Sequence, residues 1–120
     1  MTTPLAERVH ALAARATRER VAFESPADPP DPDRATAYLR EGFGPMLACY
    51  LDGRTGGRLE PFEPRDVRAI EYGLDTWLDL YARCHGRAVD PSVCVREAAS
   101  LFVQTHDLRD VATLLTGVPE

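Results

Sequence analysis

The sequence predicts an all-α fold of four to five helices in a bundle-like or orthogonal array, and two observations support this. Apolar residues recur at steps of three and four along several stretches, whereas no stretch shows the alternation typical of a strand. Proline and glycine clusters separate these stretches, as they do at helix boundaries. The pattern predicts the fold class more firmly than the order in which the helices pack.

The first helix is expected from Pro4 to Phe23, with Thr3 as its N-cap and proline at its first position. Four prolines follow between residues 26 and 32, which is incompatible with a helix interior and favours an extended spacer. The first helix could therefore dock on the rest of the chain or reach a second protomer. Its apolar stripe contains Leu5, Val9, Leu12, Ala16 and Phe23.

A second helix is expected from Pro32 to about Leu51, because its apolar phase continues through the Gly42–Pro45 segment with a kink. A turn over residues 52–57 and an extended connector should follow. The third helix is expected from Pro64 to His85, ended by Gly86. It shows the clearest seam, formed by Val67, Ile70, Leu74, Trp77, Tyr81 and Cys84.

A fourth helix is expected to open at Asp90, with Pro91 at its first position. A turn over residues 105–107 then leads to a short last helix that Gly117 closes. Length and composition suit a single helical domain over residues 1–120. It comprises an N-terminal helix (1–24), a proline-rich linker (25–32) and a helical core (33–120).

The charged residues give a net charge of −5, and all fourteen basic residues are arginine. The absence of lysine indicates a GC-rich genome, and the acidity suits a salt-rich cytoplasm. An acidic chain is a poor general binder of polyanions, because phosphate contacts need clustered basic side chains. No secretory leader or membrane span is recognisable, so a cytoplasmic location is expected.

Neither a metal site nor a catalytic site is predicted. Cys84, His85, Cys94 and His106 are suitable zinc ligands by type, but they lack the paired spacing of zinc sites. Three cysteines without paired spacing are best interpreted as reduced thiols. No catalytic motif appears, and no cofactor is expected.

The leading functional hypothesis is a non-catalytic protein–protein interaction or regulatory module, which could also be a homodimer. The apolar stripe of the first helix must be buried against something, and arginine and aromatic side chains carry interface energy. The candidate interface residues are Leu5, Val9, Leu12, Phe23, Trp77 and Tyr81.

Two alternatives remain open. Residues 95–116 could form a DNA-binding helical pair, although Asp107 and Asp110 would lie where phosphates bind. A small anion-binding or enzymatic domain could instead use the loop from Arg54 to Arg58, through Arg54, Gly56, Gly57 and Arg58.

A resemblance to known proteins rests on residues 41–45, 54–59, 77–81, 95–99, 107–112 and 115–119. Through these segments, about two-thirds of the chain resembles a family of small haloarchaeal proteins of unknown function. The resemblance implies a salt-rich archaeal cytoplasm, and it implies no activity, cofactor or catalytic residue.

Overall fold

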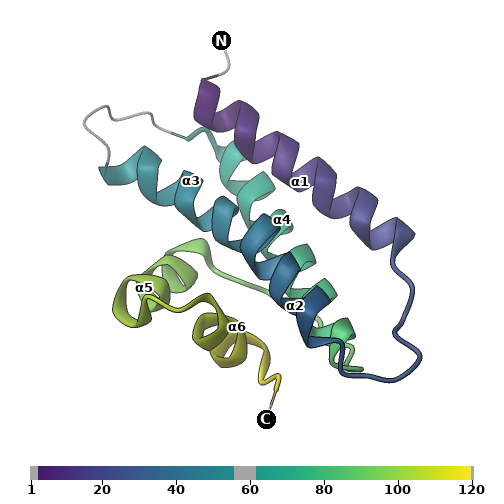
Figure 1. The fold of residues 1–120 in the computed structure, drawn as a ribbon. Helices are drawn as coiled ribbons and strands as arrows, with labels where there is room; N and C mark the ends of the chain where they lie inside the picture. Colours follow the sequence, from purple (N-terminus) through teal and green to yellow (C-terminus); the bar gives the residue numbers. More distant parts are fainter. Residues whose placement is uncertain (1–2, 56–61, 120) are drawn as a thin grey trace.

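The computed structural model describes residues 3–55 and 62–119, and within them it contains helices and no strand (Figure 1). Segments α2, η1 and α3 form one continuous helix, so the described part of the chain holds five helices and the all-α prediction is confirmed. The segments are α1 (Pro4–Ala22), α2 (Pro32–Tyr38), the π-helical η1 (Leu39–Phe43), α3 (Gly44–Thr55), α4 (Pro64–Cys84), α5 (Val95–Thr105) and α6 (Leu108–Thr116).

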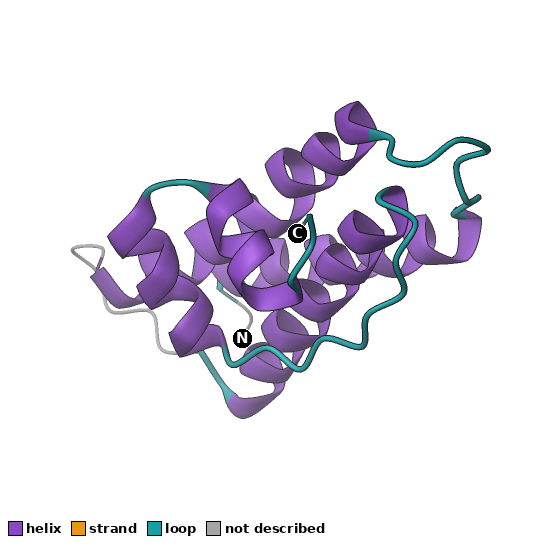
Figure 2. Ribbon diagram, turned by 90° about the horizontal axis from the view of Figure 1, so that it is seen from below, coloured by secondary structure: helices purple, strands orange, loops and turns teal. Residues whose placement is uncertain are grey.

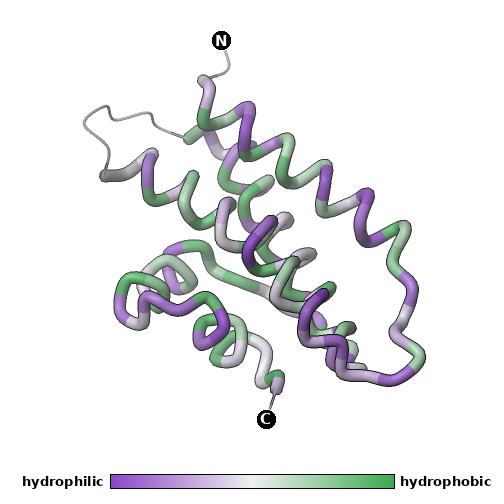
Figure 3. The backbone as a smooth tube through the Cα atoms, viewed as in Figure 1, coloured by the Kyte–Doolittle hydropathy of each residue, from purple (hydrophilic) through white to green (hydrophobic). Residues whose placement is uncertain are grey.

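Helix α4 lies at the centre of the fold and contacts each of the other helical segments. Figure 1 shows α1 along one side of it, the α2–α3 helix across it, and the α5–α6 pair beside α3. In Figure 3 hydrophobic and hydrophilic positions are interspersed along the helices, as expected of helices with one buried face. The C-terminal half of α4 is buried almost all round, through Leu74, Trp77, Leu78, Leu80, Tyr81, Ala82 and Cys84.

Helix α1 packs against α4 of the same chain, through a face of mostly small side chains. Ala6 and Ala13 are buried beside Val9 and Ala16, whereas Leu5 and Leu12 are only half-buried. The buried face is therefore rotated from the predicted stripe, because alanine allows a closer approach to α4 than leucine does. The helical core thus includes α1 and is not confined to residues 33–120.

The proline-rich linker is held to the folded chain at its end. The Asp31 amide donates to the carbonyl of Cys84, 2.7 Å away, at the end of α4. Arg34 donates to the Glu24 carbonyl at 2.9 Å, and its guanidinium lies 4.5 Å from the centre of the Phe23 ring. These contacts fix the path of the linker, which Figure 2 shows from below.

The Gly42–Pro45 segment, where a kink is predicted, overlaps the π-helical turn η1, and η1 contacts α4. A methyl group on Gly42 would overlap the Trp77 ring, so only glycine lets this backbone lie against the indole. Trp77 is 1% exposed, yet its Nε1 has no hydrogen-bond partner among the described residues. Packing rather than polar contact therefore positions the ring.

Helix α5 begins at Val95, four residues after the predicted start at Pro91. The Val93 amide donates to the Asp75 carboxylate at 2.7 Å, and the Val95 amide donates to the Glu71 carboxylate at 3.1 Å. Both acceptors belong to α4. The predicted start was wrong because these two bonds hold the amides of Val93 and Val95 on α4, and residues 91–94 are not helical although the local sequence favours a helix there.

A buried carboxylate joins α1 to the first turn of α4. Asp66 is 4% exposed and accepts hydrogen bonds from the Glu63 amide at 2.9 Å and from His10 Nε2 at 2.8 Å. Burial pushes the pKa of Asp66 up, but His10, the Glu63 amide and Arg65 together bring it below its ordinary value. Asp66 therefore stabilises the fold in its charged form.

We expect Gly42→Ala to lower the free energy of unfolding by about 1–3 kcal/mol, because its methyl group overlaps the buried Trp77 ring. In the Trp77→Leu background the same change should have little effect or stabilise, because the ring is gone and alanine is the better helix former. Urea unfolding of the four proteins measures this coupling, and additive effects would contradict the contact.

We expect Asp66→Asn to lower the free energy of unfolding by about 1–3 kcal/mol at neutral pH. The folded pKa of Asp66 lies below the unfolded one, so this contribution is present above about pH 4 and is lost as the pH falls through the folded pKa. Urea unfolding at several pH values should show the variant and the wild type converging in acid. The exposed Asp33→Asn control should stay parallel to the wild type.

Candidate functional site

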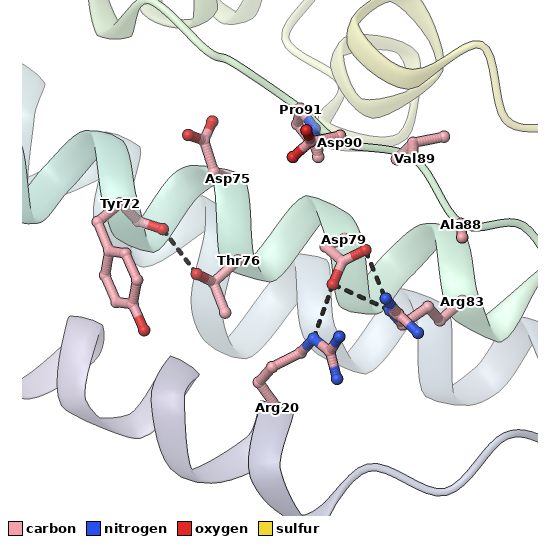
Figure 4. Close-up of a pocket in the computed structure, with 10 residues that line it drawn as sticks. All are labelled: Arg20, Tyr72, Asp75, Thr76, Asp79, Arg83, Ala88, Val89, Asp90 and Pro91. Atoms are coloured by element: carbon pink, nitrogen blue, oxygen red, sulfur yellow. Dashed lines mark hydrogen bonds and ion pairs between the residues drawn. The ribbon is translucent and has the colours of Figure 1, made fainter.

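A cleft of about 600 Å³ runs along the outer face of α4, between α1 and the segment before α5 (Figure 4). Its floor follows the helical spacing of Tyr72, Asp75, Thr76, Asp79 and Arg83. The remaining lining residues are Arg20 of α1 and Ala88, Val89, Asp90 and Pro91. The cleft thus combines two guanidinium groups with three carboxylates.

Asp79 orients both arginines of the cleft. Its carboxylate accepts from Nε of Arg20 at 2.9 Å and from Nε of Arg83 at 3.0 and 3.1 Å. Figure 4 shows the two guanidinium groups meeting at this carboxylate, one from α1 and one from α4. Each guanidinium uses only Nε in these contacts, so its four terminal N–H donors have no acceptor among the described residues.

The opposite side of the cleft is acidic. Asp75 accepts from the Val93 amide through Oδ1, and Figure 4 shows its carboxylate rising from α4 toward the segment of Asp90 and Pro91. Burial, followed by the negative charges of Glu71 and Asp90, raises the pKa of Asp75 although the Val93 bond opposes this. Negative charge is therefore crowded here, which favours a cation.

A second cleft, of about 350 Å³, lies between α1 and the start of α3, and we call it the arginine groove. Arg15 pairs with Glu41 at 3.3 Å, whereas Arg8 and Arg18 form no ion pair within the described residues. Helical spacing of seven and three residues brings the three arginines to one face of α1. The groove is lined by Arg8, Ala11, Leu12, Arg15, Arg18 and Pro45.

The predicted anion loop is only partly described. Arg54 belongs to the last turn of α3, which runs four residues past the predicted end at Leu51, so it is not a loop residue. Gly56, Gly57 and Arg58 lie outside the described residues. The structure places the described arginine clefts elsewhere, on α1 and α4.

All six candidate interface residues pack in or against the core of their own chain. Val9, Trp77 and Tyr81 are at most 2% exposed and contribute to the core, so they offer no surface to a partner in this conformation. Leu5, Leu12 and Phe23 are half-buried and pack against the same core. The outward face of α1 instead presents the arginine groove, which the sequence analysis missed.

The α5–α6 pair has the predicted turn, and Gly117 ends α6 as predicted. Asp107 accepts from the amides of Arg109 and Asp110, and His106 has the left-handed conformation that glycine more often adopts. The acidic groups therefore lie at the start of α6, as the charge argument against DNA binding requires. Arg96 and Arg109 are both exposed.

The cysteines among the four residues that suit zinc by type, Cys84 and Cys94, lie in different environments. Cys84 is buried in the core, and burial raises the pKa of its thiol to about 11, so the thiol stays protonated. Cys94 is exposed. In the part of the chain that the structure describes, no three histidine, cysteine or acidic side chains gather as metal ligands. No helix described there has the length and apolar content to cross a bilayer.

The chain belongs to a family defined as a domain of unknown function (DUF8055), which matches residues 3–120. No curated protein matches the chain, and no solved structure matches it. The expectation of an uncharacterised family is therefore confirmed, and the clefts described above are the basis for a functional proposal.

We expect Asp79→Ala to lower the free energy of unfolding by about 1–3 kcal/mol, because three charge-assisted contacts at a mostly buried carboxylate are lost. Asp33→Ala, on an exposed part of α2, is the control and should change stability far less. Thermal unfolding of the two variants makes the comparison, and equal losses would contradict the bridging role of Asp79.

Proposed function

We propose that this protein is a non-catalytic interaction module, and that the arginine groove binds an acidic segment of a partner protein. The observation that carries the proposal is the grouping of Arg8, Arg15 and Arg18 around one cleft of a chain whose net charge is −5. Three like charges on one helix face repel one another. Opposite charge on a ligand relieves that repulsion.

The chemistry of the groove favours a peptide over a small ion. Leu12, Ala11 and Pro45 provide an apolar floor between the guanidinium groups. An acidic segment with interspersed apolar residues would match both features, because guanidinium forks pair with carboxylates while the floor takes an aliphatic side chain. Nucleic acid is disfavoured, since the net charge of the chain is −5 and would repel its backbone.

The setting we propose is a salt-rich cytoplasm, supported by the lysine-free, acidic composition and by three free cysteines. At molar salt the Debye length is about 3 Å, so only charges in direct contact attract one another. Binding there would depend on direct arginine–carboxylate pairs and on the apolar floor, not on long-range steering.

The test is fluorescence anisotropy with a short labelled peptide of repeated Glu-Glu-Leu units, at low and at molar salt. We expect Arg8→Ala, Arg15→Ala and Arg18→Ala combined to weaken binding by about tenfold or more, because each arginine supplies a charge-assisted contact. The matched control combines Arg68→Ala, Arg96→Ala and Arg109→Ala. It makes the same change in net charge at exposed positions outside the groove and should bind like the wild type.

Two results would overturn this proposal. One is equal loss of peptide binding in the groove variant and the control, which would show only a response to net charge. The other is tight binding of duplex DNA that disappears when Arg96 and Arg109 are replaced. That result would favour the α5–α6 pair as a nucleic-acid interface instead.

A further inference from the structure

We infer that the cleft on α4 is a second binding site, for a small zwitterion that carries an oxyanion and an ammonium group. The oxyanion, a phosphate or a carboxylate, would lie at Arg20 and Arg83. The ammonium would lie at Asp75 and Asp90. The arginine groove uses none of these residues, so this inference is independent of the proposed function.

The oxyanion end of the site depends on the fixed orientation of the Arg20 and Arg83 guanidinium groups. Asp79, on the floor of the cleft, holds both guanidinium groups by their Nε atoms. Their terminal N–H donors are thus positioned before any ligand arrives, and the fork geometry of arginine matches an oxyanion. Arg20 and Arg83 side chains are 42% and 30% exposed, so a solute can reach both.

The ammonium end rests on the crowding of carboxylates. Asp75 uses Oδ1 for the Val93 amide, and its second oxygen makes no hydrogen bond within the described residues. Asp90 is exposed on the facing segment, and its side chain makes no ion pair with another residue that the structure describes. An ammonium group in this part of the cleft would offset the negative charge of both carboxylates.

The charge balance favours a zwitterion over a simple anion. Two arginines and three aspartates leave the cleft with one excess negative charge when all are ionised. A lone phosphate would gain from the arginines and be repelled by Asp75 and Asp90. One molecule with both groups gains at both ends, and its second contact is intramolecular. A volume of about 600 Å³ has room for such a solute.

The experiment titrates phosphoethanolamine, inorganic phosphate and ethanolamine into the labelled protein, and follows the Nε–Hε NMR signals of Arg20 and Arg83. We expect phosphoethanolamine to shift both signals and to bind about tenfold or more tightly than either half-molecule. Arg83→Lys should weaken it by about tenfold, because lysine lacks the fork. Arg68→Lys, an exposed residue of the same helix, should leave binding unchanged.

A second variant separates the two ends of the site. Asp90→Asn should weaken phosphoethanolamine binding and leave phosphate binding equal or stronger, while the exposed Asp110→Asn control changes neither. Equal affinity for phosphate and phosphoethanolamine would overturn the zwitterion assignment. Titration shifts that miss Arg20 and Arg83 would overturn the site itself. Thermal unfolding of each variant shows that it is folded, and Arg20→Gln provides an independent arginine variant.

Discussion

The C-terminal half of α4 is buried on every side except the face that lines the cleft, and the rest of the structure is arranged around it. The largest side chain of this half is Trp77. The backbone that crosses its ring lies so close that there is no room for a side chain at the crossing point. Gly42 allows this, and the π-helical turn η1 carries it past the indole. Helix α1 covers another side with alanines, because a larger residue would hold the two helices apart.

The polar side of α4 sets where its neighbours sit. Its acidic residues each accept a hydrogen bond from another part of the chain, so the helix positions its surroundings by directed contacts as well as by burial. Asp66 accepts a hydrogen bond from His10, and Asp79 accepts one from Arg20. Both donors belong to α1. Glu71 accepts a hydrogen bond from the Val95 amide, and Asp75 accepts one from the Val93 amide. Apolar burial alone would permit α1 to slide along α4, whereas these contacts fix its register.

The sequence was sufficient for the fold class and for most helix ends, because periodicity and caps are local properties. Thr3 accepts the predicted capping bond, and Gly86 and Gly117 have the positive φ expected after a helix. The arginine clefts were not predicted, since they depend on which face of α1 turns outward. From the sequence alone, either the alanine stripe or the leucine stripe of that helix could form its buried face. The close approach of α1 to α4 determines that the alanine stripe is buried.

The start of α5 has a consequence for the order of folding. Locally, Asp90 and Pro91 form a good helix start, and nothing near them in sequence opposes it. The native start four residues later exists because Glu71 and Asp75, about twenty residues upstream, hold the intervening amides. The C-terminal pair therefore acquires its native boundary only on an assembled α4. Before α4 is in place, a local helix begun at Pro91 competes for this segment, and docking on α4 gives the amides of Val93 and Val95 carboxylate acceptors instead.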